Sequence, residues 1–535
     1  MTHQLKRAFI HRAWPHHAWL HHACLYACLL GSLGIATSCG SQATQPNAAT
    51  GGVSGGASGG GSGSANPGSG GALTGGTTGS GSGGAGAVAA STGAGGGTAP
   101  TGSGGQTASP GRTGGNDGKS TGGAGGAGAT SMSGGATGTG GGAGMAGMSG
   151  STGSGFVGTG MRPFPQTVKS PNCTYPTNAK SSDVVAAYDL WKTTVVTADG
   201  AGGFLRVKKP DSGSVIGSTV SEGIGYGMLL AVYMGDQALF DSLWKYSQLH
   251  LDGQGFMNWE IGPDGSVTAG GNGGATDGDE DIAWSLVMAD KQWGGRGTLS
   301  DTYLNLGKHM IDIILMYEVD HAGGEVLKPG NNFGGAGETN PSYFAPAYYR
   351  VFGQVSGTTA DWNKVIDSSY SIISKSLNAA NGNTTNGLVP AWCNSAGVPV
   401  AFGGVILGFQ NDATRTPFRV GQDYCLFGEP RAKDYLAKIS AFYAKVGIGN
   451  ITNGYTLTGT PQPDKVYAPG LQAASFVGPA AVGAMSDAQY QQLINDGYAS
   501  LATQKLTAGT IYYQKSWSAL SLFMLNANLV DFTAK

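Results

Sequence analysis

From about residue 180 onward, apolar and polar residues alternate with the 3.6-residue period of an α-helix. Continuous apolar faces, such as the one formed by Ile311, Ile313, Ile314 and Leu315, are typical of helices that pack on two sides. The pattern predicts helices over residues 181–196, 221–234, 236–250, 279–292, 300–318, 342–353, 361–377, 417–427, 429–446, 475–484, 487–502 and 512–529.

Residues typical of helix ends support several of these bounds. Ser300 and Asp301 are predicted to open one helix and Asp361 another, and Gly235 is predicted to end the segment 221–234. About twelve helices joined by long loops rich in Gly, Asn and Pro predict an all-α domain of paired helices arranged in a toroid. The long loops 253–275 and 387–416 are expected to line a functional site.

The segment that precedes the helices has a very different composition. Of the 100 residues from Gly51 to Gly150, 43 are glycine, and most of the others are Ser, Ala and Thr. Such a segment has too few apolar side chains to form a packed core. We therefore expect a disordered linker over 40–164, with a reach of roughly 50–60 Å for about 100 residues, and a globular domain over 165–535. A glycine-rich structural wall protein is the alternative, but no strict repeat supports it.

The first 39 residues resemble an export signal. Basic residues precede an apolar run from Ala23 to Ala36, which is too short to span a bilayer comfortably. The run ends in small residues followed by Cys39, as in a bacterial lipoprotein, although Ala36 stands where leucine is usual. We expect lipidation at Cys39 or ordinary signal cleavage nearby. In both cases the protein would be secreted or attached to the outer surface of a bacterium.

Cysteine count, charge and histidine positions exclude several classes of function. Cys173, Cys393 and Cys425 remain after the leader, which allows one disulfide and one free thiol without a CxxC zinc motif. The net charge is −2 without basic clusters, which argues against nucleic-acid binding. His250, His309 and His321 are scattered, and there is no GxSxG or GxxxxGK[ST] motif. No cofactor or metal is expected, so the candidate chemistry rests on carboxylates.

The first carboxylate segment is Ser221-Glu222-Gly223-Ile224-Gly225-Tyr226-Gly227-Met228. A glutamate at a helix start is ordinarily a cap, because it stabilises the positive end of the helix dipole. Here three glycines would let another group approach closely, and Tyr226 would shield the carboxyl from water. Desolvation of that kind raises the pKa of a carboxyl, as a general acid requires. Glu222 is therefore a candidate proton donor.

The second segment has four acidic residues in five positions, Asp277-Gly278-Asp279-Glu280-Asp281. An EF-hand loop would need glycine at Ile282 and glutamate at Met288, so calcium binding of that type fails. Sugar-binding carboxylates are the remaining interpretation. In the third segment, Asn411-Asp412-Ala413-Thr414-Arg415-Thr416-Pro417-Phe418-Arg419, two arginines within reach should keep Asp412 ionised, as a general base must be. Taken alone, a structural ion pair is the better interpretation of Asp412.

Together the three segments resemble glycoside hydrolase family 8. The resemblance covers about residues 180–530 and is carried by ATDGDEDIAWSLVMADKQW (275–293), SEGIGYGM (221–228) and NPSYFAPAYYRVF (340–352). It implies an (α/α)6 barrel and an endo-acting enzyme that cuts a β-1,4-linked polysaccharide with inversion, most readily a β-glucan such as cellulose. Xylan is the alternative substrate, and a non-catalytic glycan-binding surface protein is the alternative of another class. We expect a monomer whose only membrane contact is a lipid anchor.

The resemblance also implies roles for particular residues. Glu222 matches the proton donor, Asp412 the base that activates water, and Asp277 a third catalytic carboxylate that is sometimes described as the nucleophile. Substrate-binding roles are expected for Tyr226, Trp259, Asp279, Tyr343, Arg415 and Arg419, with Trp259 as a stacking platform. Two departures from the family pattern, Asn411 and Phe418 in place of aromatic residues (tryptophan in the second case), concern subsite preference rather than the chemistry.

Overall fold

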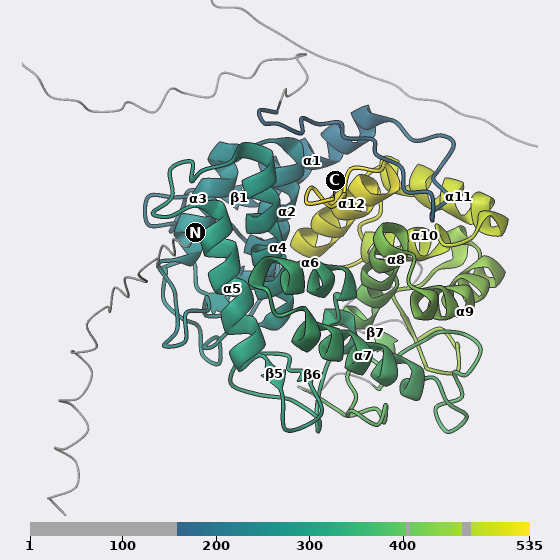
Figure 1. Ribbon diagram of the computed structural model, residues 1–535. Coiled ribbons are helices and arrows are strands. Elements are labelled where there is room, and N and C mark those ends of the chain that lie inside the picture. Colours follow the sequence, from purple (N-terminus) through teal and green to yellow (C-terminus); the bar gives the residue numbers. More distant parts are fainter. Residues whose placement is uncertain (1–157, 403–406, 463–471, 535) are drawn as a thin grey trace, which may run out of the picture. The chain divides into compact units, whose positions relative to one another are not determined.

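The computed structural model describes residues 158–402, 407–462 and 472–534. The predicted export signal, Cys39 and the predicted linker up to residue 157 lie outside these ranges. The described part is helical, as the sequence predicts, with twelve α-helices and four short pairs of antiparallel strands (Figure 1). No helix in these ranges combines the length and the apolar composition that a membrane crossing requires.

Six helices form an inner ring because their surfaces are apolar on nearly all sides. In α2 and α10, for example, all residues except Glu222 are buried. Around the ring, each inner helix packs against the next, and α12 closes it against α2. The inner helices are α2 (Ser221–Met234), α4 (Thr276–Trp293), α6 (Pro346–Ser356), α8 (Arg415–Phe427), α10 (Ala474–Ala484) and α12 (Ile511–Leu525).

The other six helices are amphipathic and cover the ring from outside. Helix α1 packs on α12, α3 on α2, α5 on α4, α7 on α6, α9 on α8 and α11 on α10. This is the (α/α)6 barrel that the sequence predicts. The outer helices are α1 (Ser181–Val195), α3 (Gln237–Ser247), α5 (Tyr303–Tyr317), α7 (Thr359–Ser376), α9 (Pro430–Val446) and α11 (Gln491–Ala502).

The strands are two residues long and pair within the loops. Their pairs are β1 (Val196–Thr197) with β2 (Arg206–Val207), β3 (Thr219–Val220) with β4 (Glu260–Ile261), β5 (Val319–Asp320) with β6 (Val326–Leu327), and β7 (Phe409–Gln410) with β8 (Gly454–Tyr455). In the second pair, Val220 lies opposite Glu260, directly before α2. This pair fixes the loop 253–275 beside the start of α2.

Several helix starts differ from the prediction for local reasons. Helix α5 begins after Thr302, whose side chain accepts a hydrogen bond from the Asn305 N–H, and not at Ser300–Asp301. Helix α7 begins at Thr359, so Asp361 lies in its first turn rather than at its start. Helix α4 begins at Thr276, earlier than the predicted residue 279, which places Asp277 on the helix. Gly235 ends α2 in the left-handed conformation, as expected.

A strap formed by residues 158–175 crosses the end of the barrel where the inner helices terminate. Its backbone N–H groups donate to carbonyls at the ends of four inner helices. The last carbonyls of a helix have no partner within the helix itself, so the strap supplies one. These bonds are Thr159 to Gly235, Met161 to Gln292, Val168 to Ala527 and Thr174 to Met485, at 2.7–3.1 Å. A disulfide between Cys173 and Cys425 joins the strap to α8, and Cys393 is a buried free thiol. Residues 159 and 161, which precede the predicted boundary at residue 165, thus already bond to the barrel.

Candidate active site

The three candidate carboxylates lie at the starts of inner helices. Glu222 and Asp277 occupy the first turns of α2 and α4, and Asp412 lies in a 3-10 turn (Asn411–Thr414) directly before α8. Because each inner helix is followed by an outer helix that returns the chain, the inner helices point the same way and their N-termini meet at one end of the barrel. That end is opposite the strap, and its helix dipoles favour negative charge.

Arg415 brings the three carboxylates together. Its Nη1 atom lies 2.5 Å from Glu222 Oε2 and 2.5 Å from Asp277 Oδ2. Its Nη2 atom lies 3.4 Å from Asp412 Oδ1. The guanidinium is buried, with its carbon 4.8 Å from the centre of the Tyr343 ring. Residues that are up to 193 positions apart in sequence therefore surround one positive charge.

The carboxylates differ in their access to solvent. The side chain of Asp412 is 33% exposed and that of Glu222 is 17% exposed, whereas that of Asp277 is only 4% exposed. Asp412 also accepts a hydrogen bond from Asn340 Nδ2 at 3.1 Å. Asp277 accepts one from the Gly278 N–H at 2.9 Å. A substrate or a water molecule can thus reach Asp412 and Glu222 more readily than Asp277.

Burial changes the ionisation of two of these groups. Desolvation raises the pKa of Asp277 to about 8, since Arg415 only partly offsets the burial and the neighbouring Glu222 and Asp412 raise it further. Burial also raises the pKa of Asp412, and Arg415 lowers it. Of the two arginines expected to hold Asp412 ionised, only Arg415 forms an ion pair with it. Arg419 instead forms a two-point ion pair with Asp281, with bonds of 2.6 and 2.9 Å.

Close contact between α2 and α4 explains the glycines of the first segment. A Cβ atom on Gly225 would lie 2.8 Å from the Asp281 Cβ and 2.9 Å from the Gly278 carbonyl oxygen. A Cβ atom on Gly278 would lie 2.6 Å from the Glu222 nitrogen. The two helices can approach this closely only because glycine stands at both positions, and this contact places Glu222 beside Asp277.

Three residues expected to bind substrate are buried. Tyr226 lies beside the carboxylates, within the influence of Glu222 and Arg415, but it is buried against Trp517 and Tyr512. Arg419 and Asp279 are also buried, the first in its ion pair with Asp281 and the second beside Glu318. Because none of the three reaches the surface, the structure does not support direct contact between them and a sugar.

Tyr343 and Trp259, which were also expected to bind substrate, lie beside the carboxylates, as Arg415 does. Tyr343 is half-buried beneath the Arg415 guanidinium. Trp259 is half-buried, its indole N–H donates to the Gly270 carbonyl at 2.8 Å, and its own carbonyl accepts from the Ser221 N–H next to Glu222. A ring held in this way at the start of α2 is suited to stacking against a sugar.

Sequence reasoning missed three polar partners of this site. The Tyr512 hydroxyl donates to Glu222 Oε1 at 2.7 Å from the start of α12. Ser342 Oγ accepts from Arg415 Nε at 3.2 Å, and Asn340 holds both Ser342 and Asp412. Asn340 and Ser342 belong to the family-like segment 340–352, which could have identified them. Tyr512 lies 290 positions from Glu222, and its helical pattern indicates only packing.

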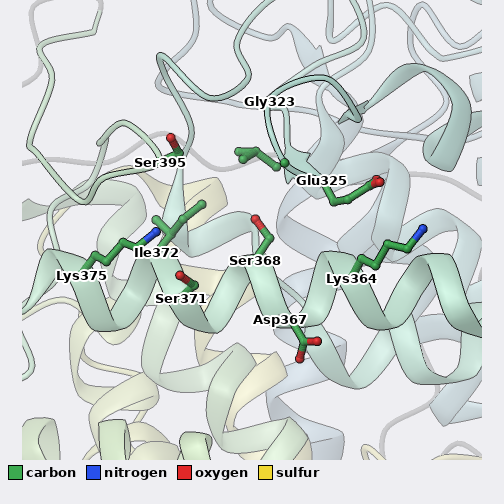
Figure 2. Close-up of a pocket in the computed structure, with 11 residues that line it drawn as sticks. Gly323, Glu325, Lys364, Asp367, Ser368, Ser371, Ile372, Lys375 and Ser395 are labelled. Atoms are coloured by element: carbon green, nitrogen blue, oxygen red, sulfur yellow. The ribbon is translucent and has the colours of Figure 1, made fainter.

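Neither a metal-binding group nor the surface pocket beside α7 offers an alternative active site in the described ranges. Within the described ranges, no group of three or more His, Cys, Asp or Glu side chains could hold a metal ion. Figure 2 shows a surface pocket of about 410 Å³ between α7 and the β5–β6 hairpin. It contains two lysines but no aromatic ring. Its two carboxyls do not face each other: Asp367 points away from the hairpin towards its partner Arg431, and Glu325 pairs with His321. The pocket therefore lacks the facing carboxylates that acid–base chemistry needs.

Known proteins resemble this chain over the whole barrel. The sequence profile of glycosyl hydrolases family 8 matches residues 162–528. Endoglucanase A of Acetivibrio thermocellus is 39% identical over 345 residues, which are 64% of this chain and 69% of that protein. The beta-glucanase of Niallia circulans is 31% identical over 396 residues, 69% of this chain and 91% of that protein. The apo structure of a beta-1,3-1,4-glucanase from Paenibacillus sp. X4 superposes with a TM-score of 0.60 at 29% identity, covering 69% of this chain and 98% of its own.

Proposed function

The chain belongs to family 8 of the glycosyl hydrolases, and from that membership we propose that it is an inverting, endo-acting β-1,4-glucanase. Glu222 protonates the glycosidic oxygen in this proposal, and Asp412 takes the proton from the attacking water. One observation carries the assignment: Glu222, Asp277 and Asp412 meet around Arg415 at the end of the barrel opposite the strap. Paired carboxyl groups on two sides of the bond are what glycoside hydrolysis requires.

The division of roles follows from exposure and charge. Burial raises the pKa of Asp277 to about 8, so Asp277 holds a proton at neutral pH, and it lies against the same guanidinium nitrogen as Glu222. Glu222 is the more exposed of the two and can deliver that proton to a sugar oxygen. Asp412 is the most exposed carboxylate, and its raised pKa makes its ionised form a stronger base.

The same reasoning argues against Asp277 as a nucleophile. A nucleophilic carboxylate must be ionised and must reach the anomeric carbon. The side chain of Asp277 is 4% exposed, and its pKa of about 8 keeps most of it protonated at neutral pH. We assign Asp277 to holding Arg415, and through it Glu222, in place.

The stereochemistry of the products tests inversion directly. Hydrolysis of a β-linked glucan by this mechanism should first release the α-anomer, which proton NMR of fresh products can observe before mutarotation. A first product with the β configuration would contradict the assignment of Asp412 as a base acting on water.

Substitution of the two reacting carboxyls tests their roles. Glu222→Gln and Asp412→Asn should each lower kcat by at least about a hundredfold, the usual contribution of a general acid or base. Circular dichroism should show an intact fold, since each amide nearly preserves the shape of the carboxyl. The matched control is Asp496→Asn, an exposed carboxyl on α11 that should leave kcat unchanged. Full activity of either active-site variant would exclude the assignment.

A β-glucan is preferred over xylan as the substrate because relatives with 31–39% identity are named endoglucanase or beta-glucanase. Reducing-sugar assays on carboxymethylcellulose, lichenan, xylan and chitosan should show the highest kcat/KM on one of the two glucans. A higher value on xylan would replace the glucanase assignment with the xylanase alternative.

Export from the cytoplasm is also part of the proposal. The Cys173–Cys425 disulfide supports it, since disulfides persist in oxidising compartments outside the cytoplasm. A lipid on Cys39 would then attach the enzyme to the outer surface of the cell. Mass spectrometry of the mature protein should find a modified cysteine at position 39, and Cys39→Ala should move the activity from the membrane fraction to the medium. An unmodified N-terminus at another position would exclude the anchor.

A further inference from the structure

Two carboxyl side chains lie beside each other in the interior, below the proposed active site. Asp279 stands on the first turns of α4, and Glu318 follows the last residue of α5. Both side chains are fully buried. Their oxygens converge on Gly274, where a Cβ atom would lie 2.8 Å from Asp279 Oδ2 and 3.0 Å from Glu318 Oε1.

The surroundings of this pair offer little compensation for negative charge. The charged groups that act on it are acidic: Asp277 and Glu280 on α4, and Asp252 in the loop after α3. Within the described part of the chain, no lysine, arginine or histidine forms an ion pair with either carboxyl. Lys328, whose backbone N–H donates to the Glu318 carbonyl, directs its ammonium group away from the pair and donates to the backbone carbonyls of Tyr317 and Asn331.

Hydrogen-bond donors are scarce as well. The Ala275 N–H and the Thr276 hydroxyl lie near the pair, but neither has good hydrogen-bond geometry to an Asp279 or Glu318 oxygen. Each carboxyl instead faces the other. Two carboxylate oxygens are both acceptors, so a stable contact between them requires a proton on one of them. Two adjacent ionised carboxylates without access to water would be strongly unfavourable.

We propose that Asp279 and Glu318 share a proton, and that this contact fixes the first turns of α4 so that Asp277 meets Arg415. The two are then positioning residues, because neither reaches the substrate. The role in activity rests on the function proposed above, whereas the shared proton does not. Asp279 is two residues from Asp277, and its backbone N–H donates to the Ala275 carbonyl in the same turn. A shift of Asp279 would therefore move Asp277.

The sign of the pH dependence follows from burial. Burial raises the pKa of both Asp279 and Glu318 well above the usual range. Asp279 raises the pKa of Glu318 further, whereas the contact with Glu318 lowers that of Asp279 and the neighbouring Asp277 raises it. A raised pKa in the folded state gives stability that is fully present below the unfolded-state pKa, about 4 for a carboxyl. That stability is lost as the pH rises through the folded-state value. Loss of the shared proton should thus loosen α4 from α5 on the alkaline side.

Amide and alanine variants separate the shared proton from simple packing. Glu318→Gln supplies an N–H donor that does not titrate, and Glu318→Ala removes the partner of Asp279. The control is Glu338→Gln, a half-buried carboxyl in the loop after β6. Thermal unfolding, and kcat and KM on a soluble β-glucan, are measured between pH 5 and 10. The metal content of the wild-type protein is measured in parallel.

On the alkaline side, the melting temperature falls as the pH rises. The proposal expects the midpoint of this fall to move to higher pH by about one unit or more in Glu318→Gln, and not to move in Glu338→Gln. It also expects Glu318→Ala to lower kcat about tenfold or more with KM nearly unchanged, and Glu318→Gln to restore most of the loss. An unchanged alkaline midpoint in Glu318→Gln would overturn the proposal even if the alanine variant does not fold. A stoichiometric metal whose removal destabilises the wild type would also overturn it. A wild type without glucanase activity would contradict the proposed function and leave the stability readout valid.

Discussion

Arg415 is one positive charge in contact with three carboxyl groups, so the free active site favours at least one bound proton. Asp277 is the buried member whose pKa rises to about 8, while Glu222 and Asp412 lie on the more exposed side. The arrangement therefore stores a proton behind the two residues that are proposed to contact the substrate. It also explains why Arg415 is fully buried, since a hydrated guanidinium would interact less strongly with all three carboxyls.

Tyr512 is predicted to orient the proton donor. Tyr512→Phe removes the hydroxyl that donates to Glu222 Oε1 and leaves the ring stacked on Tyr226. A hydrogen bond to a charged group contributes about 1.5–3 kcal/mol, so kcat/KM should fall roughly tenfold to a hundredfold. Steady-state kinetics on soluble β-glucan measures the change, and Tyr490→Phe, at the residue directly before α11, is the control. Unchanged kinetics in Tyr512→Phe would show that Glu222 does not need this bond.

The sequence could identify some residues of the site but not others. The acidic segment 277–281 and the glycines before Tyr226 are local patterns, so Asp277 and Glu222 could be found without a structure. The buried pairs Arg419–Asp281 and Asp279–Glu318 depend on which side of α4 faces the interior. In this ring both sides of an inner helix are buried, so periodicity could not separate residues that face the site from those that face a neighbouring helix.

At the level of elements, the contact between α2 and α4 depends on glycine. Gly225→Ala would introduce a Cβ atom 2.8 Å from the Asp281 Cβ, so the two helices would have to separate. Overpacking of this kind costs about 1–3 kcal/mol. We expect a lower melting temperature and a lower kcat, because Glu222 and Asp277 move apart. Differential scanning calorimetry and kinetics measure both effects.

Gly253→Ala is the matched control for that substitution. A Cβ atom at Gly253 would contact nothing within 4 Å, and the residue does not have a positive φ. Its stability should be unchanged or slightly higher. Equal stability of Gly225→Ala and the wild type would show that the helices tolerate a wider spacing.

Helices were predicted well and their starts less well. Long segments with a clear period, such as those predicted at 221–234 and 429–446, match the structure within a residue. The start of α4 lies three residues earlier than predicted because its first turn, which contains Asp277, is polar and carries no apolar period. The start of α6 differs because the loop before it already carries a turn. Residues Pro341–Tyr343 form a separate 3-10 turn, so α6 begins at Pro346 instead of residue 342. Polar loop residues that are folded by tertiary contacts leave no periodic signal.

At the level of the whole molecule, the disulfide is expected to stabilise the domain without affecting catalysis. Cys173 and Cys425 are 252 positions apart, and closing a loop of that length is worth about 5 kcal/mol by the chain-entropy estimate. The double variant Cys173→Ser/Cys425→Ser should unfold several degrees lower than the oxidised protein and should keep its kcat at 25 °C. Denaturation with and without a reducing agent measures the difference. Identical unfolding in both conditions would show that the bridge contributes little.

The strap determines the side of the barrel on which the enzyme can be joined to a tag, a fusion partner or a solid support. Residue 158 lies where α2 and α4 end, and the last described residues pack there too, with the Tyr233 hydroxyl bonded to the Val530 carbonyl and the Phe532 N–H directed at the Met288 sulfur. Both ends of the described domain therefore leave from the closed side of the barrel. A tag, a fusion partner or a solid support joined at either end would leave the opposite end, where Glu222, Asp277 and Asp412 lie, free for a long polymer. Immobilised preparations should work equally well in both orientations.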